Sequence, residues 1–438
     1  MPRARRIGRD PFLHAVSATD PAIGEGRLPS RIGGLGRWAW LVLCFVMPIS
    51  GRLVPVPLVA AVALLLAQGL WSGRSMRWSL PWPLAAFYAL HVLGMAWTAD
   101  WQFGLFDLQI KLGLILLPLA AGVLGAGRPG ALRESMIAFS AGLAVAIGLS
   151  SWKAAACYAA SGNAACFTQS ALSFELHPSY AAWYASWAIL YWGHELIAGR
   201  VRQPWLRSAA LAHLPILLAF AFMLGSRSGA VALAAVALIL LTQAVLTLRS
   251  AMRWAILGAA ALAMGGGLVI GGGTLAERAS SAVAAVRLAR SGDAAIYASE
   301  GGSEMRMVAW ICSTECLQGA PFGAGTGDIK EALVACYASK KAVPAMERRL
   351  NSHSQFLQGG VALGWPGLLL ALLIPLVPLA QGFRRRSLLL AGFALLLLTG
   401  AAVESVLEVQ AGVALVGAFL GLLSLKGHSV PSEGGGRA

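Results

Sequence analysis

The sequence predicts an all-α polytopic membrane protein with about twelve transmembrane helices and one large helical loop, on the outer side between spans 9 and 10. Of its 438 residues, 58% are hydrophobic and only 12% are charged, whereas soluble domains contain about 25% charged residues. Long apolar runs recur through most of the chain. The alternation typical of outer-membrane barrels is absent, and a spanning backbone must satisfy its own hydrogen bonds, so each run is predicted to be a helix.

The chain divides into two tails, two groups of spans and the loop. Residues 1–37 are polar and basic and lack the short apolar stretch of a secretory signal, so we expect a disordered cytoplasmic tail. Residues 426–438 are expected to form a second cytoplasmic tail. Spans 1–9 fall within 38–273, the loop covers 274–355, and spans 10–12 fall within 356–425. The apolar runs are 38–51, 53–71, 80–97, 104–125, 132–152, 178–198, 209–225, 229–247, 254–273, 356–381, 388–403 and 408–425.

The basic residues orient the chain in the membrane. With an even number of spans, the side that carries both tails would hold 21 of the 34 Lys and Arg but only six of the 19 Asp and Glu. The positive-inside rule makes that side cytoplasmic. The net charge of +15 then reflects topology and contact with anionic membrane lipids, and it indicates no nucleic-acid partner.

Five of the six cysteines lie in the two segments expected on the outer side, a short one before span 6 and the large loop. This distribution is typical of an oxidising compartment such as a periplasm. We expect a disulfide between Cys157 and Cys166. Cys336 is expected to pair with Cys312 or Cys316, and the candidate pair is Cys316 with Cys336; free thiols in small helices are the alternative. No cysteine spacing indicates a zinc site.

The large loop is expected to contain three helices, at 275–291, 304–318 and about 328–340, with a glycine-rich turn at 321–328. It carries nine basic and eight acidic residues. Because these charges balance, the loop is not a general anion-attracting surface, and particular residues must account for any binding.

Two arginines are candidates for binding a phosphate. Arg227 lies in a Gly-Ser-Arg-Ser-Gly turn between spans 7 and 8, where the charge bias disfavours a basic residue. Its guanidinium offers a fixed fork of donors that suits a phosphate at the outer leaflet; an arginine that reaches lipid headgroups is the alternative. Arg306, in the second loop helix, would bind the other phosphate of a diphosphate, or else form a surface ion pair with Glu304 or Glu300.

His353 is the candidate proton acceptor. It lies in the motif Asn-Ser-His-Ser-Gln-Phe-Leu at 351–357, directly before span 10. An imidazole with an ordinary pKa near 6.5 suits proton abstraction at neutral pH. Ser354 and Gln355 of the same motif are possible supporting residues. A lone histidine at a membrane interface is also often structural.

Three further residues are weaker candidates. His177 begins span 6 and could contact a sugar or phosphate, although capping of that helix explains it equally well. Lys111 lies within span 4, where a charge is costly and therefore a candidate for donor binding; pairing with Asp107, four residues earlier, is the alternative. Glu404 and Glu408, before the last span, could orient the arginines of the site.

Several other site classes are not indicated by the sequence. The Gly-x-Gly-x-Gly stretch within 321–328 has no preceding strand, so it does not fit a dinucleotide fingerprint. There is no P-loop, no Gly-x-Ser-x-Gly and no Asp-x-Asp motif. No metal and no cofactor is therefore expected.

The order of motifs resembles a known family. A Ser-Arg-Ser-Gly at a span boundary precedes a long outer loop, which carries Arg-x-x-x-Trp, then Pro-Phe-Gly-Ala-Gly-Thr-Gly, and ends in Asn-Ser-His-Ser-Gln-Phe-Leu at the next span. This arrangement resembles the O-antigen ligase and polymerase superfamily of C-type glycosyltransferases. The architecture matches over most of the chain, and the motifs fall between about 215 and 370.

The resemblance implies a metal-independent, inverting glycosyl transfer on the periplasmic side of the bacterial inner membrane. The donor would be a polysaccharide on undecaprenyl diphosphate, and the acceptor of a ligase a sugar hydroxyl of lipid A–core. Arg227 and Arg306 would neutralise the departing diphosphate, and His353 would take the proton of the attacking hydroxyl.

Two alternatives differ in activity. A polymerase of the same superfamily often has two large periplasmic loops, whereas the first outer loop here has only about 25 residues. A polysaccharide transporter or flippase would place polar residues at mid-membrane and often shows repeated halves, neither of which is evident. The ligase is the preferred prediction.

Overall fold

The computed structural model describes residues 27–71, 80–126, 128, 130–254, 258 and 280–425. In this part of the chain the regular structure consists of helices, without a strand, which confirms the predicted all-α class. The helices are α1 (Arg27–Val46), α2 (Pro55–Trp71), α3 (Trp82–Gly94), α4 (Trp101–Lys111), α5 (Gly113–Gly125), α6 (Ala131–Ser161), α7 (Gln169–Leu172), α8 (Pro178–Ile197), α9 (Pro204–Met223), α10 (Arg227–Thr247), α12 (Ala295–Ala298), α13 (Gly302–Gly319), α14 (Ile329–Ser339), α15 (Val343–Glu347), α16 (Gln355–Arg384), α17 (Leu388–Val403), α18 (Gln410–Leu415) and α19 (Gly421–Ser424). Two 3₁₀ turns, η1 (Met95–Trp97) and η2 (Ala164–Phe167), and a π-helical turn, η3 (Val416–Leu420), connect some of them.

The apolar helices make the chain a multi-pass membrane protein. Five segments are long and apolar enough to cross a bilayer: Trp101–Gly125, Ala131–Ser161, Pro204–Met223, Arg227–Thr247 and Gln355–Arg384. Shorter apolar helices of 10–17 residues are Gly34–Val46, Pro55–Trp71, Trp82–Trp97, Leu388–Val403 and Gln410–Ser424. The predicted ninth span, 254–273, lies outside the described residues apart from positions 254 and 258, so the count of twelve stays a prediction.

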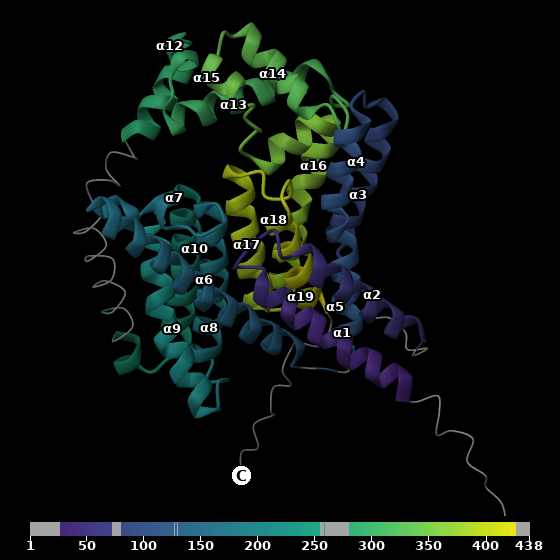
Figure 1. Ribbon diagram of the computed structural model, residues 1–438, viewed down its shortest axis with the longest axis vertical. Helices are drawn as coiled ribbons and strands as arrows, with labels where there is room; N and C mark the ends of the chain where they lie inside the picture. Colours follow the sequence, from purple (N-terminus) through teal and green to yellow (C-terminus); the bar gives the residue numbers. More distant parts are fainter. Residues whose placement is uncertain are drawn as a thin grey trace, which may run out of the picture.

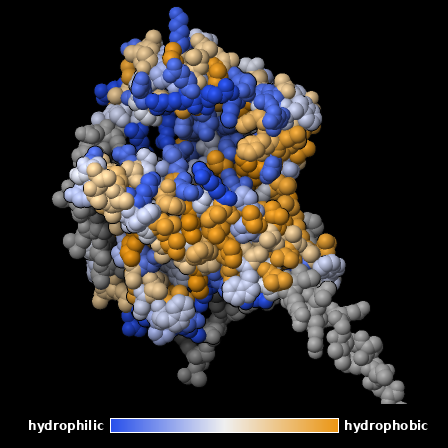
Figure 2. Space-filling model, in the orientation of Figure 1, coloured by the Kyte–Doolittle hydropathy of each residue, from blue (hydrophilic) through white to orange (hydrophobic). Residues whose placement is uncertain are grey.

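The helices of the predicted loop gather at one end of the molecule (Figure 1). This group, which we call the roof, consists of a helical stretch at 280–291 and of α12, α13, α14 and α15, and it ends before α16. Helices α13 and α14 correspond to the helices expected at 304–318 and 328–340. Hydrophilic side chains cover the roof, whereas hydrophobic ones form a broad band across the body below it (Figure 2).

Three boundaries differ from the prediction. Helix α1 begins at Arg27, inside the tail expected to be disordered up to residue 37. Helix α6 continues to Ser161, past the predicted end at 152, until Gly162 adopts the left-handed conformation that ends helices. The predicted span 104–125 is divided at Leu112 into α4 and α5.

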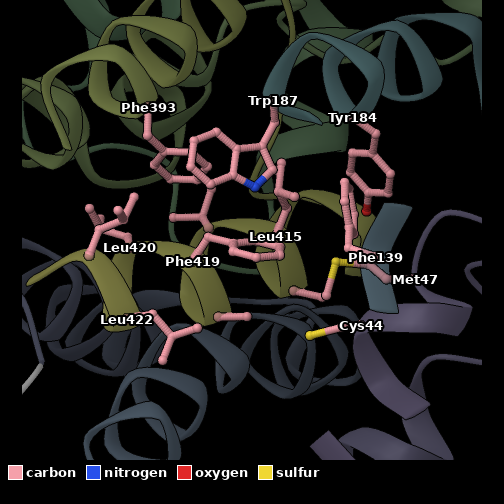
Figure 3. Close-up of a cluster of buried hydrophobic side chains, with 14 of the residues drawn as sticks. Cys44, Met47, Phe139, Tyr184, Trp187, Phe393, Leu415, Phe419, Leu420 and Leu422 are labelled. Carbon is pink, nitrogen blue, oxygen red and sulfur yellow. The ribbon is translucent and has the colours of Figure 1, made fainter. Parts of the chain in front are cut away.

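A cluster of aromatic side chains packs the centre of the bundle (Figure 3). The ring of Trp187 on α8 lies 4.8 Å from that of Phe393 on α17 and 5.5 Å from that of Phe419 on η3, both nearly edge-to-face. Phe139 on α6 contacts Phe419 at 5.3 Å. Such edge-to-face pairs add about 0.5–1.5 kcal/mol each beyond the burial of area. They hold together α6, α8 and α17, and the ends of the latter two helices carry the residues described below.

The glycine-rich turn at 321–328 docks the roof onto the bundle. Gly364 interrupts α16 with φ +66°, and a Cβ there would lie 1.8 Å from the Pro321 carbonyl oxygen, so only glycine fits. At this break the amide of Trp365 donates to Pro321 O at 3.0 Å, and the amide of Ala324 donates to Val361 O at 2.9 Å. The turn is therefore a structural element, and it fixes α13 relative to α16.

Each of the two segments that were expected on the outer side contains one disulfide. Cys157 is bonded to Cys166, as the sequence predicted. Cys336 is bonded to Cys312, and Cys316 is a free thiol, so the candidate pair of Cys316 with Cys336 is wrong. Cys316 lies one helical turn beyond Cys312 on α13 and donates to a backbone carbonyl instead. The Cys312–Cys336 bond ties α13 to α14 within the roof.

Candidate functional site

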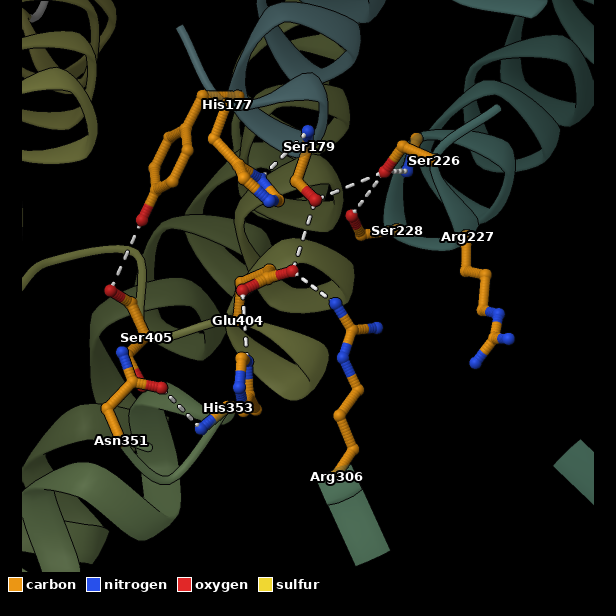
Figure 4. A network of polar contacts seen from close by, with 12 residues as sticks. His177, Ser179, Ser226, Arg227, Ser228, Arg306, Asn351, His353, Glu404 and Ser405 are labelled. Atoms are coloured by element: carbon orange, nitrogen blue, oxygen red, sulfur yellow. Dashed lines mark hydrogen bonds and ion pairs between the residues drawn. The ribbon is translucent and has the colours of Figure 1, made fainter. Parts of the chain in front are cut away.

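The candidate site is organised around Glu404, the residue that ends α17 (Figure 4). Its Oε1 accepts from Arg306 Nη2 at 2.6 Å and from Ser179 Oγ at 3.1 Å. Its Oε2 lies 3.6 Å from His353 Nδ1. One carboxylate thus brings together side chains from the start of α8, from the roof helix α13 and from the segment before α16.

His353 is held by its backbone as well as by Glu404. Its φ of +45° is uncommon for a residue with a side chain. The Asn351 side chain accepts from the His353 amide at 3.0 Å, and Trp310 Nε1 donates to the His353 carbonyl at 3.3 Å. The imidazole side chain is 24% exposed. Because Nδ1 faces Glu404, Nε2 is the ring nitrogen left to meet a substrate.

Arg306 contacts a different partner from those considered from the sequence. Neither Glu300 nor Glu304 forms its ion pair; Glu404, 98 residues away, does. The Arg306 side chain is 22% exposed and that of Glu404 is 11% exposed. One guanidinium nitrogen is engaged, and a guanidinium carries five N–H donors in all. Arg306 can therefore keep Glu404 and still offer donors to an anion.

Arg227 lies at the first position of α10, where Ser226 caps the helix by accepting from the Gly229 amide at 3.2 Å. Its guanidinium donates to Ser303 Oγ and, at 3.4 Å, to Ser281 Oγ, both in the roof. Ser303 is in the first turn of α13, one turn before Arg306. The two arginines consequently lie next to the same end of α13, and Figure 4 shows the Arg227 side chain extending from α10 towards that side.

A row of serine hydroxyls connects the two sides of the site. Ser226 Oγ donates to Ser179 Oγ at 3.2 Å and contacts Ser228 Oγ at 2.9 Å, and Ser179 in turn donates to Glu404. Helices α8 and α10 approach closely here, since a Cβ on Gly229 would lie 2.5 Å from that of Ala182. A chain of hydrogen bonds therefore runs from Ser226, the neighbour of Arg227, through Ser179 to Glu404.

His177 both caps a helix and borders the site. Its Nδ1 accepts from the Ser179 amide at 3.3 Å, which makes it the N-cap of α8. Burial lowers the pKa of His177; Glu404 opposes this shift, while Arg306 and His353 add to it. A neutral imidazole beside the cluster can accept or donate a hydrogen bond, so the two roles expected for His177 are compatible.

The electrostatics of the cluster favour an ionised Glu404. Burial raises the pKa of this carboxyl, but the nearby His353 imidazole and the charge of Arg306 outweigh it, and the pKa lies below its ordinary value. The carboxylate therefore remains charged at neutral pH. In the described part of the chain, no three His, Cys, Asp or Glu side chains are grouped in a way that could hold a metal ion.

Lys111 does not lie where a donor could reach it. Its side chain is fully buried, and its Nζ pairs with Asp107 Oδ1 at 2.5 Å and Glu408 Oε2 at 2.8 Å. The expected pairing with Asp107 is present. The prediction that Lys111 contacts a donor phosphate does not fit a side chain that is fully buried. Gln355 and Ser354 are also buried, at 1% and 4% exposure, so their support of the site is indirect.

Sequence reasoning missed the partners that assemble the site. Ser179 and Ser303 were not singled out, because single serines are common in a membrane protein, and Trp310 entered only as the last residue of the Arg-x-x-x-Trp motif. Ser179 and Glu404 are 225 residues apart, and no local pattern reveals such a contact. The His-Pro-Ser start of α8 could have indicated only a helix cap.

The comparison with known protein families agrees with the motifs. An O-antigen ligase family model matches residues 213–372, a segment that contains Arg227, Arg306 and His353. Glu404 and Lys111 lie outside the matched segment. No curated protein matches the chain. The family match confirms the resemblance to the O-antigen ligase and polymerase superfamily and does not distinguish between its two activities.

Proposed function

Since the chain carries an O-antigen ligase family segment around this cluster, we propose that it transfers polysaccharide from undecaprenyl diphosphate to a sugar hydroxyl of lipid A–core. The observation that carries the proposal is the meeting of Arg306 and His353 at one carboxylate, Glu404, with Arg227 beside the same roof helix. These residues come from four separate parts of the chain. A base and two permanent cations in one place suit the displacement of a diphosphate.

In the proposed reaction, His353 is the general base. Nε2 takes the proton of the acceptor hydroxyl while the oxygen attacks the anomeric carbon, and the bond from that carbon to the diphosphate oxygen breaks. Attack from the face opposite the leaving group inverts the anomeric centre. Glu404, 3.6 Å from Nδ1, orients the ring and stabilises the imidazolium that forms.

Arg227 and Arg306 would bind the leaving diphosphate. Negative charge builds up on it as the glycosidic bond breaks, and preorganised cations stabilise that charge most in the transition state. Glu404 and the roof serines already hold the two guanidinium groups in place. No cofactor is part of the proposal.

The proposed location is the periplasmic face of the inner membrane, with both termini cytoplasmic. The distribution of basic residues supports this orientation. The two disulfides in segments next to the site fit an oxidising compartment. Reporter fusions at the two termini would test it, and a periplasmic signal from either end would contradict it.

The decisive experiment uses the purified protein in liposomes with a lipid-diphosphate glycan and a lipid A–core acceptor. Glycan on the core, formed without added metal and lost in the His353→Ala variant, is the expected result. Lengthening of the glycan on its polyprenyl carrier would identify a polymerase. Movement of the intact lipid-linked glycan between leaflets without transfer would identify a transporter.

A further inference from the structure

A second ion cluster includes Glu408, which lies four residues after Glu404 on the same loop between α17 and α18. We propose that this cluster, formed by Lys111, Asp107 and Glu408, is a positioning element that holds Glu404 and His353 in register for catalysis. The inference rests on the proposed transferase function for its kinetic part and on the contacts alone for its structural part.

The cluster is built from buried charges. Lys111 is 0% exposed, Asp107 3% and Glu408 12%, measured on their side chains. Lys111 and Asp107 lie one turn apart on α4, whereas Glu408 comes from 297 residues further along the chain. A buried ammonium is stable only when it is paired, so Lys111 ties α4 firmly to the loop.

Gln355 carries this tie to the site. Its Nε2 donates to Glu408 Oε1 at 3.0 Å, and its Oε1 accepts from the Leu407 amide at 2.6 Å. Its own amide donates to the Glu404 carbonyl at 3.1 Å. Gln355 thus makes three hydrogen bonds with the loop between α17 and α18, and it lies two residues after His353 in the sequence. The segment with the proposed base and the loop with its carboxylate partner are locked to each other.

The two parts of the lock depend on each other. Glu408 uses one oxygen for Lys111 and the other for Gln355. If Lys111 loses its charge, Glu408 and Asp107 become two buried carboxylates without a cation. Their repulsion and lack of solvation then favour a rotamer of Glu408 that faces water. Gln355 then loses a partner, and the loop can shift Glu404 relative to His353. Misplacement by about 1 Å can cost an enzyme a hundredfold in rate.

The test compares Lys111→Met with Lys153→Met, a matched control at another outer lysine, whose Nζ donates only to the Ser173 carbonyl among the described contacts. A second variant, Glu408→Gln, keeps the contact with Gln355 and removes the charge that Lys111 binds. The variants are purified in full length and their unfolding temperatures are measured. Two readouts follow: kcat and donor KM in the liposome assay, and reaction of His353 with diethylpyrocarbonate, followed by mass spectrometry with His213 of α9 as internal reference.

For Lys111→Met we expect kcat to fall about 10- to 100-fold, the donor KM to stay within about twofold, and His353 to be modified severalfold faster. Glu408→Gln should lower kcat and speed the labelling of His353 by smaller factors. Lys153→Met should match the wild type in both measurements. A raised donor KM with unchanged kcat would mean that Lys111 contacts the donor, and would overturn the proposal.

Wild-type kcat and wild-type His353 labelling in both network variants would also overturn it. If Lys111→Met does not fold, Glu408→Gln decides alone by the same two readouts. If the wild type transfers no glycan, the proposed function fails, while the labelling of His353 still tests whether the cluster positions it.

Discussion

The loop between α17 and α18 presents two carboxylates to two different environments. Glu404 meets Arg306 and His353, whose side chains are 22% and 24% exposed. Glu408 meets Lys111, which water does not reach at all. The first cluster is partly exposed and has guanidinium donors to spare, whereas in the second the single ammonium of Lys111 is paired with both carboxylates. The first cluster is therefore suited to the proposed binding and chemistry, and the second to the proposed positioning role.

This comparison also separates stability from activity. Removing one partner of a fully buried pair typically costs about 3–5 kcal/mol, because it leaves an uncompensated charge. Pairs that water can reach contribute about 0–1 kcal/mol. Substitution of His353 should therefore reduce turnover with little effect on unfolding, whereas substitutions of Glu404, which is only 11% exposed, and of the sealed cluster should affect both.

The largest effect is expected for His353→Ala. Loss of the general base should lower kcat by about 100- to 10,000-fold, while the unfolding temperature in detergent changes little. Transfer of glycan to lipid A–core in liposomes measures the rate. Activity close to that of the wild type would show that His353 is not the general base. The proposed catalytic role of the Glu404 cluster would then fail.

Arg227→Lys is expected to lose about 100-fold in activity, since a point charge cannot replace the two-pronged grip of a guanidinium. The control is Arg287→Lys, an exposed arginine on the 280–291 helix of the roof. The liposome assay over a range of donor concentrations compares the two. Equal activity of both variants would show that Arg227 does not bind the diphosphate.

Glu404→Gln should reduce kcat by about 10- to 30-fold, because the ring of His353 loses its orienting charge. The pKa of Glu404 is lowered, so its ion pair stabilises the folded state fully above the ordinary carboxyl value of 4.5 and is lost as the pH falls below that. The difference in unfolding temperature between wild type and variant should persist from neutral pH down to that value and then shrink.

Glu331→Gln is the control for this pH dependence, since its ion pair with Arg349 is about half exposed on both sides. It should show almost no difference from the wild type at any pH. A Glu404→Gln difference that still grows below pH 4.5 would contradict the assigned ionisation of Glu404.

The smallest effects are expected in the roof. Cys312→Ser removes the disulfide with Cys336 and should reduce activity by a few-fold as α13, which carries Arg306, loosens from α14. Cys316→Ser should have no effect. Alkylation of free thiols in the denatured but non-reduced protein, followed by mass spectrometry, checks the pairing independently: Cys316 and Cys44 should be labelled, and Cys312 should not.

The sequence predicted the class of fold and indicated Arg227, Arg306 and His353 as site candidates, for identifiable reasons. Apolar runs reveal membrane helices directly, and Arg227, Arg306 and His353 fall in short motifs whose order is informative. What it could not supply were the partners. Glu404 was named only as a residue that could orient arginines, and its contacts to α8, α13 and the segment before α16 depend on the packing of distant helices.

Lys111 illustrates the same limit from the other side. A lone lysine in an apolar run correctly indicated an unusual environment, but its spacing from Asp107 revealed only half of its partners. The assignment to donor binding was corrected because Glu408 arrives from the other end of the chain and closes the cluster. The choice between Cys312 and Cys316 failed similarly, since both lie on one helix and only its rotation selects the partner.

The way the roof is fastened has a mechanical consequence. The roof is hydrogen-bonded to α16 at the break around Gly364. Arg306 belongs to the roof helix α13, whereas Arg227 belongs to α10. A ligand held by both guanidinium groups would add a further link between α10 and the roof, beside the hydrogen bonds of Arg227 with Ser303 and Ser281. Departure of the diphosphate would remove that added link, so release of the spent carrier would weaken the attachment of the roof to α10.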